Sequence, residues 1–153
     1  MKPVVLIKPL LLLVIIFQVV ASQAAEKDPV YTGLFSNLAI KGFDAVAYFT
    51  EGRAVEGSRE FSTVHQGAEW RFSGQAHLAM FLADPEAYAP QYGGYCAYAV
   101  AQGDTASAEP DLWTIYAGKL YLNYNRRINQ TWTQNMEQFI RQADQNWPAV
   151  LSN

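Results

Sequence analysis

Residues 60–83 read EFSTVHQGAEWRFSGQAHLAMFLA and predict a β-hairpin followed by a helix. Residues 60–64 and 68–72 are short strand candidates, and they flank a turn that contains a glycine at residues 65–67. Ser73 can cap a helix over about residues 74–83. The helical spacing of its large apolar side chains predicts that three of them face inward: Leu78, Phe81 and Leu82.

The flanking sequence predicts further short elements on both sides of this stretch. Residues 44–49 are mostly apolar and read as a buried strand that ends at a turn containing Gly52. Pro85 follows Asp84 and opens a helical turn through Tyr88. Residues 95–102 are compatible with a short helix that ends at Gly103, and a buried strand is the alternative.

The C-terminal third predicts a second hairpin and a long helix. Residues 112–116 and 120–123 flank the turn at 117–119. Large apolar side chains then recur at helical spacing until Pro148 stops the run: Ile128, Trp132, Met136, Phe139, Ile140 and Trp147. The expected fold is α+β, a small antiparallel sheet with packed helices in a single domain.

The composition excludes several classes of protein. The chain has 153 residues, of which 50% are hydrophobic and 14% aromatic, so it can bury a core and is not disordered as a whole. Its single cysteine cannot form a disulfide within the chain. A formal net charge of −3 provides no electrostatic surface for nucleic acid. The sequence contains neither a phosphate-binding glycine loop nor a serine-hydrolase elbow.

The N-terminus predicts a secretory signal peptide over residues 1–24. Lys2 and Lys8 precede an apolar run at residues 10–20, and small residues follow around Ala24. Eleven helical residues rise only about 16 Å, which is short of a bilayer core of about 30 Å, so a retained membrane anchor is the weaker alternative. We expect cleavage after Ala24, with export to the periplasm as one domain over residues 25–153 and no stable membrane anchor.

Several stretches carry a resemblance to a known family. GFDAVAYF at residues 42–49, HQGAEWRFS at 65–73 and FLADPEAY at 81–88 resemble a YHS domain. APQYGGYCAYAV at 89–100 and NWP at 146–148 resemble its exported, stand-alone branch. The resemblance covers nearly all of the predicted mature chain. It implies the YHS fold and the handling of a heavy metal.

The resemblance also implies candidate metal ligands, although the sequence departs from the family pattern. Ala47, Ser73 and His77 stand at the metal-associated cysteine positions, so of these only His77 could bind a metal. His65 matches the family histidine, and Cys96 is an additional thiol. We therefore expect Cys96, His65 and His77 to be the metal ligands, with Met80 or Asp44 nearby. Thiolate and imidazole ligands suit copper(I) or zinc.

Two alternatives to a metal site remain open. Cys96 can instead be an inert core residue or a reactive thiol. A thiol and a histidine can act as nucleophile and base, but the sequence indicates neither an oxyanion hole nor a third catalytic residue. The protein can also be a non-catalytic module that binds a small molecule or a protein partner through aromatic side chains: Tyr92, Tyr95, Tyr98, Trp113 and Tyr116. The oligomeric state is left open.

Overall fold

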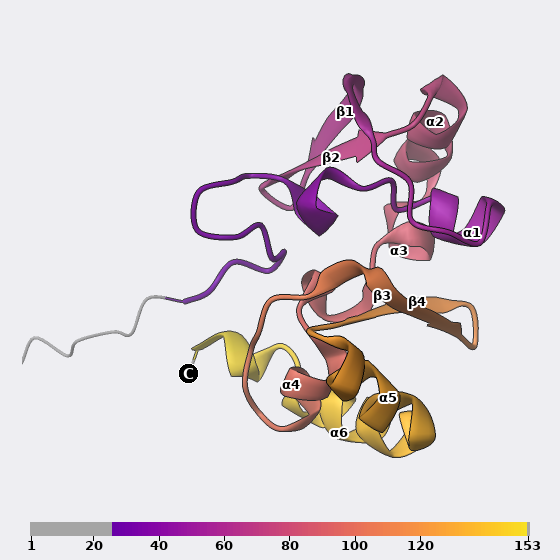
Figure 1. Ribbon diagram of the computed structural model, residues 1–153. Coiled ribbons are helices and arrows are strands. Elements are labelled where there is room, and N and C mark those ends of the chain that lie inside the picture. Colours follow the sequence, from indigo (N-terminus) through magenta and orange to yellow (C-terminus); the bar gives the residue numbers. More distant parts are fainter. Residues whose placement is uncertain (1–25, 153) are drawn as a thin grey trace, which may run out of the picture.

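The computed structural model describes residues 26–152, and the predicted signal peptide lies outside them. The described chain is a single α+β domain with two antiparallel sheets of two strands each and six α-helices (Figure 1). In this part of the chain no helix is long and apolar enough to cross a bilayer.

The N-terminal half of the domain is built around the first predicted hairpin. Its turn at Gln66 and Gly67 has positive φ at both residues, 48° and 80°, as a type I′ turn requires. The first strand extends slightly beyond its predicted bounds, and the second has the predicted bounds. The elements of this half are η1 (Ala39–Gly42), α1 (Ala47–Thr50), β1 (Ser58–His65), β2 (Ala68–Phe72), α2 (Gln75–Ala83) and α3 (Pro85–Tyr88).

The C-terminal half contains the second predicted hairpin and the remaining helices. The hairpin again turns at two residues of positive φ, Ala117 and Gly118. Of the two readings of residues 95–102, the helix is confirmed. The elements are η2 (Gln91–Gly94), α4 (Ala97–Ala101), β3 (Glu109–Tyr116), β4 (Lys119–Asn123), α5 (Arg126–Gln134), α6 (Met136–Asn146) and η3 (Ala149–Ser152).

The prediction of a strand at residues 44–49 was wrong, because this segment contains the helical turn α1. The Asp44 carboxylate accepts hydrogen bonds from the backbone N–H groups of Val46 at 2.9 Å and Ala47 at 3.2 Å. These bonds satisfy donors that a helix leaves unpaired at its first turn. Burial was predicted correctly, since the segment lies in the core, but the Asp44 carboxylate binds the amides at the start of a helical turn.

Two details of the first predicted helix were also wrong. Gly74, not Ser73, is the N-cap of α2, and the Ser73 hydroxyl instead donates to Asp44 at 2.7 Å. Phe81 is buried and Leu78 packs against the same core, but 57% of Leu82 is exposed. Phe81 and Leu82 are neighbours in a helix, so they point in directions about 100° apart.

The long terminal helix is divided into α5 and α6 at Asn135, whose φ of −141° and ψ of 45° are not helical. The apolar spacing continues across this break, which is why the sequence reads as one helix. Trp132 and Ala143 are buried, whereas Phe139 is half-buried.

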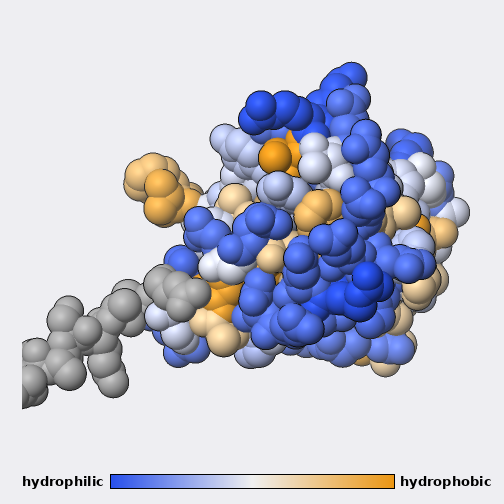
Figure 2. Space-filling view, turned by 90° about the horizontal axis from the view of Figure 1, so that it is seen from below, coloured by the Kyte–Doolittle hydropathy of each residue, from blue (hydrophilic) through white to orange (hydrophobic). Residues whose placement is uncertain are grey.

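Figure 2 shows the molecule from below with respect to Figure 1, and this face is mostly hydrophilic.

Strand β4 joins two hydrophobic clusters and so makes the two halves one domain. Leu120 and Leu122 belong to the cluster that contains the first hairpin, together with Trp70 and Phe81. Tyr121 belongs to the second cluster, which surrounds Trp132. Successive side chains of a strand point to opposite faces, so one strand contributes to both clusters.

Candidate functional site

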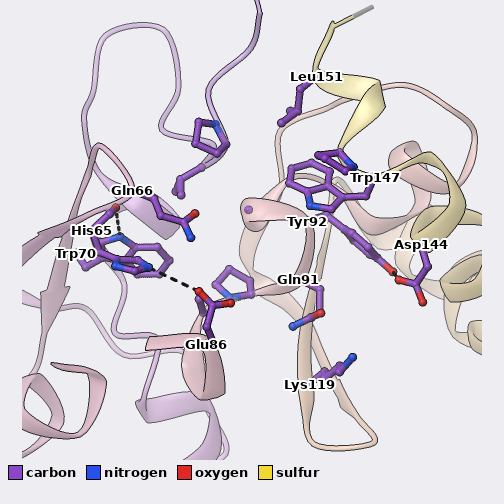
Figure 3. Close-up of a pocket in the computed structure, with 16 residues that line it drawn as sticks. His65, Gln66, Trp70, Glu86, Gln91, Tyr92, Lys119, Asp144, Trp147 and Leu151 are labelled. Carbon is purple, nitrogen blue, oxygen red and sulfur yellow. Dashed lines mark hydrogen bonds and ion pairs between the residues drawn. The ribbon is translucent and has the colours of Figure 1, made fainter. Parts of the chain in front are cut away.

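A cleft of about 510 Å³ lies where the two halves of the domain meet. Its volume is within the range of about 300–1,000 Å³ that is usual for small-molecule sites. Figure 3 shows His65, Gln66, Trp70 and Glu86 on one side, and Tyr92, Asp144, Trp147 and Leu151 on the other. Segments far apart in the chain therefore build the two walls.

The first wall is organised by His65, the last residue of β1. Its ring packs edge-on against Phe81 and Trp70, with centroid distances of 5.7 and 6.3 Å. Its backbone carbonyl accepts a hydrogen bond of 3.1 Å from Nε1 of Trp70. The imidazole is thus held between aromatic side chains in one orientation.

The Nε2 atom of His65 is buried and has no hydrogen-bond partner. The nearest acidic atom, Glu86 Oε1, lies 3.9 Å away, which is beyond hydrogen-bond distance. A buried polar atom without a partner costs about 1–3 kcal/mol, and such atoms are uncommon in native proteins. The exposed 27% of the His65 side chain therefore belongs to its other atoms.

The second wall contains Tyr92 and Trp147. The Tyr92 hydroxyl donates to Asp144 Oδ1 at 2.8 Å, and burial, followed by the neighbouring Asp144, raises the pKa of Tyr92. Tyr92 therefore stays a neutral donor. The Trp147 ring packs against Tyr92 and Tyr95, with centroid distances of 6.0 and 6.2 Å.

The backbone of η2 is unusual where it borders the cleft. Tyr92 has φ 57° and ψ 37°, a left-handed conformation that is unfavourable for a residue with a Cβ. Gly93 follows with φ 61°, and a Cβ there would lie 1.8 Å from the Pro29 carbonyl oxygen. The Gly93 carbonyl accepts a hydrogen bond of 2.9 Å from the Tyr31 N–H. This glycine lets the N-terminal segment lie directly against η2, where Pro29 and Val30 line the cleft.

The structure places the three predicted metal ligands among different neighbours. Only His65 lines the cleft. His77 lies on α2, where its Nδ1 is 2.6 Å from Asp44 Oδ2 and its Nε2 is 3.1 Å from Thr50 Oγ1. Over residues 26–152, no three His, Cys, Asp or Glu side chains are grouped so that they could hold one metal ion.

Cys96 lies in the core, immediately before α4, and is 1% exposed. Its Sγ is 3.6 Å from Asn123 Oδ1 and donates to it. Burial raises the pKa of the Cys96 thiol, and the N–H groups of Ala99, Tyr124 and Tyr98 only partly oppose this. The side chain is therefore a neutral thiol at pH 7 rather than a helix-stabilised thiolate.

We expect Cys96 to react slowly with iodoacetamide in the native protein, because its sulfur is both buried and protonated. The rate should rise to that of a free thiol when the protein is unfolded in guanidinium chloride. If Cys96 is a metal ligand, copper(I) should slow the native reaction further, and His65→Ala or His77→Ala should weaken that protection. Fast labelling of the native protein would contradict the assignment of Cys96 to the core.

Of the aromatic residues proposed as pocket residues, only Tyr92 lines this cleft. Tyr95 supports it from behind through Trp147 and donates a hydrogen bond of 2.9 Å to the Asp28 carbonyl oxygen. Sequence reasoning missed Glu86, Trp147 and Asp144. Each looked like an ordinary helix or core residue, and no local pattern connects residue 86 to residue 147.

The chain was also compared with known proteins. No family model, curated protein or solved structure matches it.

Proposed function

We propose that this protein is an exported, non-catalytic binding module that takes a small molecule in the cleft between His65 and Trp147. The observation that carries this proposal is the cleft itself, which has a volume of about 510 Å³ and is lined by residues from both halves of the domain. A cleft of this size can hold a small molecule, and His65, whose side chain is 27% exposed, packs against Trp70 and Phe81 in one wall.

Binding accounts for the cleft better than nucleophilic catalysis does. The one thiol, Cys96, is buried in the core and does not line the cleft. The polar groups that do line it are suited to hydrogen bonding: an imidazole at His65, carboxylates at Glu86 and Asp144, and an ammonium group at Lys119. Groups of this kind orient a ligand.

Metal handling, which the resemblance to YHS domains implies, remains a separate prediction. It needs Cys96, His65 and His77 to act on one ion, and these residues have different neighbours here. The cleft proposal requires only His65 of these three. Copper(I) and zinc therefore belong among the probes but are not the expected ligands.

The proposal is tested by thermal unfolding of the purified chain in the presence of sugars, amino acids, nucleosides, polyamines, copper(I) and zinc. A compound that binds the folded state raises the Tm. We expect at least one organic compound to do so. We expect His65→Phe, which keeps an aromatic ring between Trp70 and Phe81, to abolish the shift.

The matched control is Glu137→Gln on α6, a residue that lies outside the cleft. This variant should keep the full ligand-induced shift in Tm. The proposal is rejected if no organic compound shifts the wild-type Tm, or if the shift survives in His65→Phe.

A further inference from the structure

We infer that two copies of this chain associate through an exposed loop, with the apolar tip of each copy, Leu34 and Phe35, lying in a surface hollow of the other. This inference goes beyond the proposed function and does not depend on the ligand of the cleft. It follows from the exposure of the tip, the shape of the surface beside it and the charges around it.

The tip consists of two neighbouring large apolar side chains that are almost without contacts. Leu34 is 94% exposed and Phe35 is 101% exposed, which are the highest values among the large apolar side chains of residues 26–152. Figure 2 shows hydrophobic atoms that project beyond the rest of the surface. One exposed apolar side chain is ordinary, whereas adjacent ones form a continuous apolar patch, and such patches are typical of interaction sites.

The loop that carries the tip is held at both ends. Before it, Val30 is buried and the Tyr31 N–H donates a hydrogen bond of 2.9 Å to the Gly93 carbonyl oxygen. After it, the Asn37 carbonyl oxygen accepts a hydrogen bond of 2.7 Å from the Glu69 N–H. The residues between these anchors are few, so the tip projects from a fixed base and loses little freedom when a partner covers it.

A hollow of about 350 Å³ lies beside the tip, between the N-terminal segment and residues 105–107. The rings of Tyr31 and Tyr95 are part of its lining, and their centroids are 5.3 Å apart. This volume is at the lower end of the range of about 300–1,000 Å³ for sites that accept small molecules, so an aromatic side chain can enter it. The tyrosine rings offer a phenylalanine the edge-to-face contacts that aromatic pairs prefer.

The tip and the hollow belong to one continuous patch, because Leu34 is part of the tip and also lines the hollow. A twofold dimer brings the same patch of both subunits together. A patch with a projecting part next to a concave part can match itself, since each tip then faces the hollow of the other copy. This shape favours a second copy as the partner.

The charges around the hollow also favour a second copy over a lipid bilayer. The whole chain has a formal net charge of −3, but the charged residues that line the hollow, Lys27 and Asp28, have opposite signs. Two such patches do not repel each other as two patches of one sign would. Surfaces that bind bilayers usually carry an excess of Lys and Arg, which this patch lacks.

The size of the patch predicts a weak, reversible dimer. A buried phenylalanine side chain contributes about 150–250 Å². Two tips and the hollow walls that they cover bury roughly 1,200 Å², which is the lower limit for specific, stable interfaces. We therefore expect a dissociation constant in the micromolar range.

The experiment is sedimentation equilibrium of the purified chain at about 5 to 500 μM, where a weak dimer changes its population by mass action. We expect the wild type to dimerise and Leu34→Ser and Phe35→Ser each to raise the dissociation constant about tenfold or more. Both side chains are almost fully exposed, so these variants should keep the wild-type Tm when it is measured at a concentration where the wild type is monomeric.

Two further variants test the two halves of the contact. Leu82→Ser is the matched control, because Leu82 is an exposed leucine on α2 that lies outside the patch, and it should leave the dissociation constant within about twofold. Thr105→Trp fills the hollow from its own wall without changing the tip, and it should prevent dimerisation as the tip variants do.

The inference is overturned if the wild type remains a monomer at every concentration, or if its dimer survives in Phe35→Ser or in Thr105→Trp. Co-flotation with phosphatidylcholine and phosphatidylglycerol vesicles gives the other decisive result. A monomer that floats with the vesicles only when Leu34 and Phe35 are present would identify the tip as a membrane contact instead. None of these results bears on ligand binding in the cleft, so the proposed function stands or fails separately.

Discussion

Asp44→Ala is expected to lower the free energy of unfolding by about 3–5 kcal/mol, because it removes a buried charge that several groups depend on. The carboxylate is fully buried. Besides the two amides at the start of α1, it accepts hydrogen bonds of 2.8 and 2.7 Å from the N–H and hydroxyl of Ser73, and His77 Nδ1 lies 2.6 Å from it. Each of these groups would lose a partner.

The measurement is a denaturant titration of wild type and variant, followed by circular dichroism. Ser73→Ala is the matched control, since it removes one hydroxyl from the same cluster and should cost only about 1 kcal/mol. An Asp44→Ala midpoint no lower than that of Ser73→Ala would show that the cluster contributes little to stability.

We also expect the Asp44 carboxyl group to make the free energy of unfolding depend on pH. Burial by itself would raise the pKa of its carboxyl, but the hydrogen bonds from Ser73 and His77 hold the pKa below its usual value. The unfolded chain therefore binds a proton at higher pH than the folded protein. The contribution of the carboxylate is fully present above the unfolded pKa of about 3.9, and it is lost as the pH falls through the folded pKa.

This acid dependence can be measured as the free energy of unfolding between pH 6 and pH 2. We expect the wild type to lose stability below about pH 4 more steeply than Asp44→Asn, which cannot titrate at this position. Parallel curves for the two proteins would contradict the role assigned to the carboxylate.

Trp132→Ala is expected to lower the free energy of unfolding by about 3–5 kcal/mol, the usual cost of removing a large aromatic side chain from a core. Trp132 is fully buried in the second cluster, and its ring lies 5.2 Å from that of Tyr121. Its loss would leave a cavity between α5 and β4.

Trp132→Phe provides the control in the same denaturant titration. The Trp132 Nε1 atom is buried without a hydrogen-bond partner, so phenylalanine removes an unsatisfied donor while it keeps most of the apolar contact. We expect its cost to be well below that of alanine. An alanine variant with an unchanged midpoint would mean that this side chain is not part of the core.

Both hairpins could be predicted because the signals that define them are local. Gln66–Gly67 and Ala117–Gly118 adopt the left-handed turn conformations that short hairpins need, and strand residues flank both pairs. The helical turn after Asp84 is local in the same way, because the Asp84 side chain accepts a hydrogen bond from the Ala87 N–H. Such bonds join residues only a few positions apart.

The candidate site could be predicted only in part. His65 was singled out from the sequence and lies in the cleft, but it was expected to share a metal with Cys96 and His77. The sequence shows which side chains can bind a metal, but not how far apart the fold places them. Glu86 and Trp147 became candidates only when the fold brought them to the same cleft as His65.

The sequence by itself determined the α+β class, both hairpins and the apolar stripe that buries Trp132, because each depends on neighbouring residues or on a regular period. The tertiary structure decided how the segment at residues 44–49 is fixed in the core, since Asp44, besides its local bonds to the amides of Val46 and Ala47, also binds Ser73 and His77 from distant elements. It also decided where the cleft lies, because contacts between residues such as Pro29 and Gly93 arise only when the whole chain is packed.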